Sequence, residues 1–375
     1  MNLEYPGSEL VSINPNTPPG SKPLIRSKPI MKADELTYLL WDVADIDVQQ
    51  QFLLDFGMLN ASKTSDGLLM KTYGTSPYVY VGRKAEKHRF VGMGFTALTR
   101  EDLANLAAQS GAKVESLNRI GGGEVVRLTD PNGIVIEVTH GISPVESIPT
   151  RADALPVNTP EQKVRVNRGQ RPKLMPAPVM KLGHCVTAAN NMVEVCEWYM
   201  HHLGLIPSDV LCLDDASPIV AFMRLDRGDK PSDHHCVVVG KGAGKGYLHS
   251  AYEVVDLDAI AQGQQYLKNK RYKHVWGIGR HLLGSQLFDY FNDPAGCEFE
   301  HYADGDVYTS DHPTSYHPMD PGNTYSWGPD MPKEMLKPTF KQIVAILKGV
   351  FDGAVTLKWL KLATKVTSRS PRPWM

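Results

Sequence analysis

The sequence lacks the features that would direct it to a membrane or to a nucleic acid. Its 375 residues carry a formal net charge of −1, so no cationic excess is available to attract phosphate backbones. No apolar run reaches the roughly 18 residues that cross a bilayer. The N-terminal segment has neither the basic nor the apolar stretch of a secretory leader. We therefore expect a cytoplasmic globular protein with no nucleic-acid partner.

Cysteine is also scarce, and its arrangement excludes two common kinds of site. The five cysteines form no CxxC pair and are odd in number, so they predict neither a disulfide framework nor a zinc–thiolate site. We interpret them as small buried apolar side chains in a reducing compartment. They are Cys185, Cys196, Cys212, Cys236 and Cys297.

The chain is long enough for two compact domains of ordinary size. Two stretches rich in proline and polar residues divide it, as arms and linkers do. We predict an extended arm at 1–33, a first module at 34–142, a linker at 143–178, a second module at 179–306 and a C-terminal tail at 307–375.

The two modules read as copies of each other. The first ends on the turn Asp130-Pro-Asn-Gly, with Glu137 four residues after the glycine. The second ends on Asp293-Pro-Ala-Gly, with Glu300 at the same spacing. Both are β-turn sequences that lead into a strand.

Each module also carries two amphipathic helices between apolar strands. The first helices stop at Gly57 and Gly204, and the second ones begin at Thr99 and Asp256. Strand, helix and three strands, repeated, predict an α+β fold. In that fold each module is a pair of βαβββ repeats that form a curved, mixed-sheet half-barrel, and a helical C-terminal tail follows.

Three strands of the second module carry His184, His249 and Glu300. If these side chains share the concave face, they form a facial triad of two imidazoles and one carboxylate. Such a triad leaves three adjacent positions open, which suits non-haem Fe(II) and fits a substrate together with O₂. Mn(II) is the alternative metal, because this ligand set does not separate the two ions.

The first module has no such triad. Aligned on the ends of the first helices, the place of His184 is taken by Thr37, and the place of His249 falls at Gly92. Glu137 matches Glu300 but has no histidines beside it. We therefore expect the first module to be free of metal and Glu137 to be structural.

The most specific segment of the chain runs from Gly277 to Glu300. It contains Gly279-Arg-His281-Leu-Leu-Gly, then Tyr290, then the Asp293-Pro-Ala-Gly turn. This pattern resembles the type I extradiol ring-cleaving dioxygenases of the vicinal-oxygen-chelate (glyoxalase, bleomycin-resistance and dioxygenase) superfamily. The resemblance covers about residues 33–306.

The resemblance implies a role for each matching residue. His184, His249 and Glu300 match the metal ligands, while His235 matches the acid–base histidine. His281 and Tyr290 match groups that bind the substrate by hydrogen bonds and assist catalysis. His234 stands next to His235 and leaves the acid–base role open by one residue, although we favour His235.

The implied activity is Fe(II)-dependent cleavage of a catechol-type ring next to its diol, with both atoms of O₂ inserted, in the catabolism of aromatic compounds. We expect Trp276 to help shape the pocket for the ring, but the ring substituents cannot be read from the sequence. Two alternatives stay open: a glyoxalase-like metalloenzyme, and a protein of this fold that binds an aromatic ligand.

The tail holds two further features. Residues 326–332 (SWGPDMP) are placed to cap the mouth of the site. Residues 339–366 combine an apolar face with five lysines and predict a helix that packs on the body or on a second subunit. A helix that lies on a membrane surface is the rival interpretation. We expect a homo-oligomer and no membrane contact.

Overall fold

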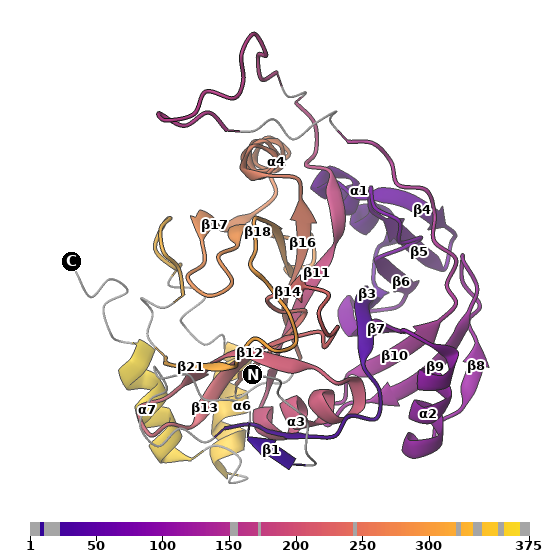
Figure 1. Cartoon of the computed structure of the whole chain (residues 1–375), viewed down its shortest axis with the longest axis vertical. Coiled ribbons are helices and arrows are strands. Elements are labelled where there is room, and N and C mark those ends of the chain that lie inside the picture. The colour runs from indigo at the N-terminus through magenta and orange to yellow at the C-terminus, as the bar shows by residue number, and fades with distance from the viewer. Residues whose placement is uncertain are drawn as a thin grey trace.

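Two large mixed β-sheets lie side by side and organise the molecule (Figure 1). The computed structural model describes residues 8–10, 23–150, 157–171, 174–242, 246–319, 324–332, 340–351 and 356–367. One sheet comes from the first half of the chain and the other from the second half. The predicted α+β fold is confirmed.

The first sheet has eight strands. In spatial order they are β4 (Leu59–Lys63), β5 (Gly67–Lys71), β6 (Tyr80–Lys84), β3 (Ala33–Val43), β7 (Arg89–Ala97), β10 (Val135–His140), β9 (Glu124–Thr129) and β8 (Val114–Ser116). Helices α1 (Ile46–Phe56) and α2 (Arg100–Ser110) accompany this sheet.

The second sheet has nine strands. In spatial order they are β17 (His274–Arg280), β18 (Leu287–Asn292), β19 (Glu298–Ala303), β16 (Gly246–Val254), β11 (Val179–Ala189), β15 (Val237–Lys241), β13 (Pro218–Arg224), β12 (Ile206–Cys212) and β21 (Ser315–Pro318). Its helices are α3 (Met192–Leu203) and α4 (Leu257–Asn269).

The same unit of strand, helix and three strands occurs four times in these sheets. In the first sheet the leading strands β3 and β7 pair antiparallel at the centre, and each pairs in parallel with the last strand of its own unit. The second sheet repeats this arrangement around β11 and β16. The predicted pairing of βαβββ repeats is therefore confirmed, and β21 is added at one edge.

The helices begin and end where the sequence predicts. Asp45 accepts hydrogen bonds from two backbone N–H groups of the first turn of α1, and Thr99 forms a capping box with Asp102 at the start of α2. Gly57 and Gly204 end α1 and α3 in the left-handed conformation, with φ of 108° and 71°. A side chain would strain the backbone there, so glycine stops both helices.

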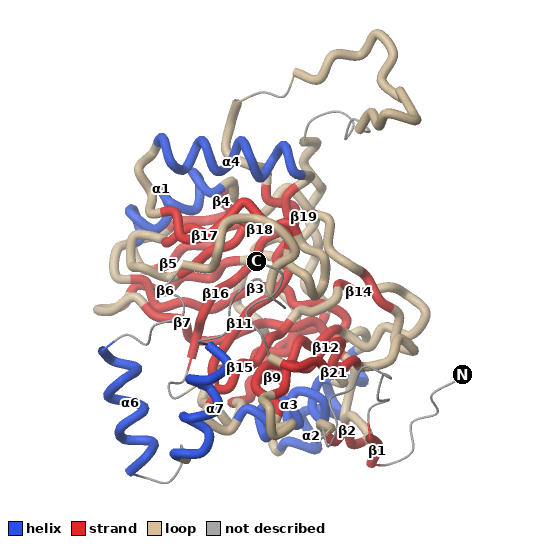
Figure 2. The backbone as a smooth tube through the Cα atoms, turned by 90° about the vertical axis from the view of Figure 1, so that its left-hand side faces the viewer, coloured by secondary structure: helices blue, strands red, loops and turns tan. Residues whose placement is uncertain are grey.

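The helices lie at the two ends of the sheets. Helices α1 and α4 lie at one end and α2 and α3 at the other (Figures 1 and 2). Between them, one continuous apolar core runs through both halves of the chain. Phe56 of α1 stacks on His301 of β19 with ring centroids 3.8 Å apart, and His301 Nε2 bonds to the Phe56 carbonyl. The two halves therefore share one interior.

Smaller elements complete the fold. Strand β1 (Ser8–Leu10) pairs with β2 (Ile25–Ser27), and β14 (Ser232–Asp233) pairs with β20 (Val307–Tyr308). None of the described helices is long and apolar enough to cross a membrane.

The predicted tail helix is two helices, α6 (Phe340–Phe351) and α7 (Leu357–Thr367); Thr339 lies outside the described residues. Lys358 and Lys365 of α7 pair with two aspartates of the turn between β12 and β13. Helix α6 leaves Leu347 and Phe351 exposed, the latter 92%. We keep self-association through this face as a prediction, and we likewise propose the domain boundaries given above.

Candidate metal centre

His184, His249 and Glu300 lie on three neighbouring strands of the second sheet. They belong to β11, β16 and β19, and β16 is the middle strand of the three. Ala251 of β16 is the register partner of both His184 and Glu300. The predicted strands therefore bring the three side chains together on one face, and one potential ligand atom of each lies within 4.8 Å of those of the other two.

The distances within this triad suit a shared metal ion. Glu300 Oε2 lies 3.3 Å from His184 Nε2 and 3.4 Å from His249 Nε2. Ligands with metal bonds of about 2.0–2.1 Å stand about 3.0–3.4 Å apart. Both carboxylate oxygens of Glu300 are buried and have no hydrogen-bond partner among the described residues. A carboxylate in this position needs a cation, and a divalent metal fits it.

The electrostatics of the triad favour metal binding as well. Burial alone would raise the pKa of Glu300, but the imidazoles of His184, His249 and His281 hold that pKa well below its ordinary value. Burial lowers the pKa of His184. An ionised carboxylate and a neutral imidazole are the forms that coordinate metals.

His235 packs directly on the triad. Its ring centroid lies 4.2 Å from that of His184, and its Nδ1 lies 2.8 Å from His234 Nδ1. Both histidines are buried, although they are adjacent in sequence, because they belong to an irregular segment between β14 and β15. His234 faces away from the triad, toward Asp209.

A chain of hydrogen bonds links His235 to Asp209 through His234. Asp209 accepts from His234 Nε2 at 2.6 Å and from His317 Nε2 at 2.8 Å, and its pKa is lowered to about 2 although burial opposes this. As Asp209 is ionised, it accepts a hydrogen bond from His234 Nε2. In the tautomer in which His234 also accepts at Nδ1, His235 carries its proton on Nδ1 and keeps Nε2 free as a base. Burial, with His184 and His234 nearby, places the pKa of His235 well below its ordinary value and keeps it neutral.

Tyr290 and His281 lie on the other side of Glu300. Tyr290 of β18 is the register partner of Glu300, and its hydroxyl is 3.0 Å from His281 Nε2. The same His281 nitrogen is 3.7 Å from Glu300 Oε1. The ring of Tyr290 also meets that of His249 edge-on at 5.1 Å. All three predicted second-sphere residues, His235 included, thus surround the triad.

Trp276 lies one layer behind Tyr290. The two rings stack with centroids 5.8 Å apart, and the indole Nε1 donates to the carbonyl of Pro329. Segment 326–332 crosses β17 here: Trp327 pairs with Arg280 in a β-bridge. The segment therefore lies beside the predicted pocket residues and supports Trp276, which is itself buried.

The corresponding place in the first sheet holds a guanidinium group. Glu137 pairs with Arg119 at 2.6 Å and with Arg127 at 2.9 Å, and Tyr38 donates to it at 2.7 Å. Burial raises the pKa of Glu137, but these partners outweigh it and leave the pKa below its ordinary value. Gly92 occupies the place of His249, as predicted.

The predicted counterpart of His184, Thr37, is wrong by one residue. Tyr38 pairs with Gly94 as His184 pairs with Ala251, so Tyr38 is the true counterpart. The error arose because α3 has 12 residues and α1 has 11, which shifts an alignment made on the helix ends. Thr37 instead contacts the hydroxyl of Thr96.

We predict that Glu137→Gln destabilises the protein by about 3 kcal/mol, the low end for breaking a buried ion pair, because Arg127 is partly exposed and screened. Urea unfolding near neutral pH measures this. Since the folded pKa of Glu137 is depressed, its contribution is present above the unfolded pKa and is lost as the pH falls through the folded one. The free energies of unfolding of the wild-type protein and the variant should therefore become equal in acid. Equal free energies of unfolding at neutral pH would contradict this account.

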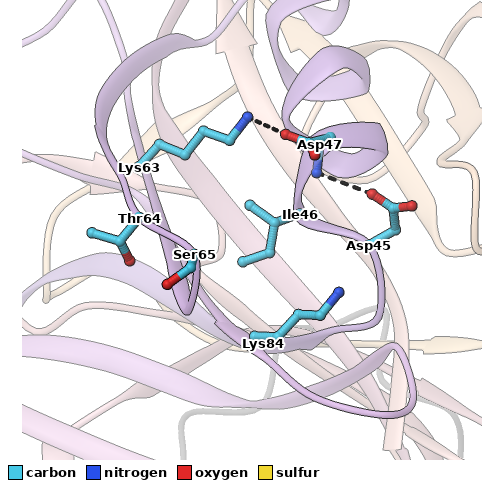
Figure 3. A pocket seen from close by; sticks show the side chains of 7 residues that line it. All are labelled: Asp45, Ile46, Asp47, Lys63, Thr64, Ser65 and Lys84. Carbon is cyan, nitrogen blue, oxygen red and sulfur yellow. Dashed lines mark hydrogen bonds and ion pairs between the residues drawn. The ribbon is translucent and has the colours of Figure 1, made fainter.

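A separate surface pocket lies at the start of α1 (Figure 3). Its two cations are already engaged: Lys63 with Asp47 and Gln50, and Lys84 with the carbonyl of Ala44. Because no residue that lines it belongs to the triad, it is not the candidate centre.

Asp209 and His317 were not predicted from the sequence. Asp209 lies in the strand Ile206–Cys212, in which every residue is buried. A buried aspartate in a fully buried strand must have a partner, and this was the available signal. His317 is 108 residues away from Asp209, and no local pattern connects the two.

The chain was compared with known protein families, proteins and solved structures. No family model matches the chain. Metapyrocatechase 2 of Cupriavidus necator is 27% identical over 321 residues, which cover 84% of this chain and 94% of that protein.

Two solved structures share the fold. The Mn(II)-bound glyoxalase of Novosphingobium aromaticivorans has a TM-score of 0.66 and 24% identity, over 80% of this chain and 93% of that one. The complex of homoprotocatechuate 2,3-dioxygenase of Brevibacterium fuscum with 3,4-dihydroxyphenylacetate has a TM-score of 0.68 and 18% identity, over 82% and 93%. With the match to metapyrocatechase 2, the resemblance to the extradiol ring-cleaving dioxygenases is confirmed: the chain is similar to that protein and shares the fold of a solved 2,3-dioxygenase.

Proposed function

We propose that His184, His249 and Glu300 hold an Fe(II) ion at which this dioxygenase cleaves a catechol-type ring next to its diol. The observation that carries the proposal is Glu300, a buried carboxylate whose two oxygens lack hydrogen-bond partners in the described structure and face two imidazole nitrogens. Two imidazoles and one carboxylate with open positions are the ligand set of non-haem Fe(II) oxygenases.

The metal ion and the side chains around it have separate roles in the proposed reaction. A metal ion held by His184, His249 and Glu300 would supply a Lewis-acid centre for the diol and for O₂. His235 takes the proton of a catechol hydroxyl on its free Nε2 and returns it later in the reaction. Tyr290 donates a hydrogen bond to an oxygen that gains charge. His281 positions that hydroxyl with its Nε2, while its Nδ1 donates to the carbonyl of Thr324.

The direct test is turnover after anaerobic reconstitution with Fe(II). Catechol, 3,4-dihydroxyphenylacetate and alkylcatechols should consume O₂ and give a yellow ring-opened product, with Mn(II) compared in parallel. If the chain loaded with either metal consumes no O₂ with any of these substrates, the proposal is wrong.

We predict that Asp209→Asn lowers kcat by on the order of 10–100-fold, the usual cost of losing a supporting residue at a metal site. An amide can donate a hydrogen bond to His234 as well as accept one. His234 is then no longer held in the tautomer that leaves His235 Nε2 without a proton. The effect should fall on kcat and leave both the metal content and the KM for catechol unchanged. Asp209→Glu is the matched variant and should restore part of kcat. A selective loss of metal in Asp209→Asn would instead give the residue a purely structural role.

A glyoxalase-like reaction is the second candidate, because the Mn(II)-bound glyoxalase shares this fold at 24% identity. Such an isomerisation needs a metal and a base but no O₂. The buried chain from His235 to Asp209 and the pair of Tyr290 and His281 favour the oxygenase. Isomerisation of a hemithioacetal without O₂ uptake would favour the glyoxalase.

A further inference from the structure

A second group of metal-ligating side chains lies where the two sheets meet. His88 immediately precedes β7 of the first sheet, while Asp293 and Cys297 flank the turn between β18 and β19 of the second. One potential ligand atom from each residue lies within 4.8 Å of the other two. Within the described part of the chain, this group and the triad are the two clusters with that property.

His88 and Asp293 face each other in the interior. His88 Nε2 and Asp293 Oδ2 are 3.3 Å apart, and their side chains are 8% and 0% exposed. Neither atom makes a hydrogen bond to any described residue. Two ligands of a tetrahedral zinc ion with bonds of about 2.0 Å stand about 3.3 Å apart. Buried polar atoms are seldom left without partners, so the pair points to a missing group between them.

The turn itself presents Asp293 to His88. Oδ1 of Asp293 accepts hydrogen bonds from the backbone N–H groups of Ala295 at 2.9 Å and Cys297 at 2.8 Å. These bonds fix the carboxylate and direct its other oxygen, Oδ2, away from the turn. The position of that oxygen therefore does not depend on any ligand.

The duplicated turn of the first module provides an internal comparison. Asp130 Oδ1 makes the same backbone bonds, but its Oδ2 accepts a hydrogen bond from the hydroxyl of Tyr199 at 3.1 Å. Ile134 stands where Cys297 stands in the second turn. The first turn is thus satisfied without a ligand, whereas the second has a free oxygen, an imidazole and a thiol at the same place.

We propose that His88, Asp293 and Cys297 bind a zinc-class divalent cation that joins the two halves of the chain. Imidazole and thiolate select borderline-soft ions such as Zn²⁺ or Co²⁺ over Mg²⁺ and Ca²⁺. Three protein ligands leave a fourth position for water. Cys297 is only partly buried, and the proposal gives it a ligand role in place of the apolar one expected from the sequence, while the other four cysteines are buried and belong to neither cluster.

Binding must displace the proton of Cys297. Burial, together with Asp293 and Glu298, raises the pKa of that thiol to about 12, so the free protein holds it protonated. Affinity for the cation should therefore increase with pH. The site is independent of the proposed dioxygenase activity, since it shares no residue with the triad.

Cobalt distinguishes the two sites because only the second contains sulfur. Co²⁺ should be titrated anaerobically into the full-length protein whose triad is already loaded with Fe(II). We expect a thiolate-to-cobalt charge-transfer band in the near ultraviolet that saturates at one ion per chain, and a higher melting temperature. Zn²⁺ should abolish the band by displacement.

Three variants test whether the charge-transfer band comes from Cys297. Cys297→Ser should remove it, His88→Gln should weaken binding at least 10-fold, and the control Cys212→Ala should keep it. Saturating Co²⁺ with no thiolate band in the wild-type protein would overturn the proposal. A band that persists in Cys297→Ser would overturn it as well, because another cysteine would then be the ligand.

Discussion

Replacement of His249 by alanine is expected to abolish metal retention and ring cleavage together. His249 supplies one of two imidazole ligands, and its Nε2 lies 3.4 Å from the carboxylate that lacks hydrogen-bond partners. Residues that merely support a metal site cost 10–100-fold in affinity or activity when removed, so a direct ligand should cost more than about 100-fold. Metal content by elemental analysis and kcat with catechol under saturating Fe(II) measure the two effects.

The matched control for this variant is His201→Ala, which removes a histidine of α3 that does not belong to the triad. It should keep both the metal and the activity. Turnover at the wild-type rate in His249→Ala, with iron still bound in one equivalent, would refute the ligand assignment. Loss of activity in both variants would instead mean that the effect is not specific to His249.

Replacement of His235 by asparagine should give the second largest effect, a decrease in kcat of about 10²–10⁴-fold, the range that a general acid–base group contributes. Asparagine retains a short polar side chain but cannot take up or release a proton. The metal should stay, since His235 packs on His184 without being a ligand. Single-turnover kinetics, with the anaerobic catechol complex mixed with O₂, would separate binding from the later steps.

The parallel variant His234→Asn decides between the neighbours. In the described structure His234 bonds to His235 and Asp209 and is not a member of the triad, so its loss should decrease kcat less than the loss of His235 does. Normal turnover in His235→Asn would move the acid–base role to His234 or to another group. Equal losses in both would mean that the two histidines act as one unit.

The repeats were predictable because local chemistry specifies them. Asp45, Thr99 and Asp256 cap helices through bonds to residues two or three positions away, and Gly57 and Gly204 end helices through their own backbone freedom. The two Asp-Pro-x-Gly turns then mark equivalent strands. These signals predict the repeat of strand, helix and three strands, and they place the triad on three strands of the second module.

Single-residue register was harder to predict. The counterpart of His184 was misplaced onto Thr37 because an extra residue in α3 is invisible when helices are aligned by their ends. In a strand, one residue decides which face a side chain occupies, so a small error in helix length changes the chemistry assigned to a site. Only the pairing of Tyr38 with Gly94 corrects it.

Contacts between distant segments could not be predicted. Asp209 meets His317 across 108 residues, and His88 meets Asp293 from the other module. In both pairs, the residues next to each member in the sequence give no sign of which distant residue it contacts. The roles we propose for Asp209 and for the second cation site therefore come from three-dimensional packing alone.

Oxygen labelling tests the central proposal most directly. The Fe(II)-reconstituted protein should be given catechol under dioxygen labelled with oxygen-18, and the product analysed by mass spectrometry. The account predicts one ring-opened 2-hydroxymuconic semialdehyde-type product that carries both labelled atoms before exchange with water. A product without label, or a ring opened between the two hydroxyl groups, would contradict it.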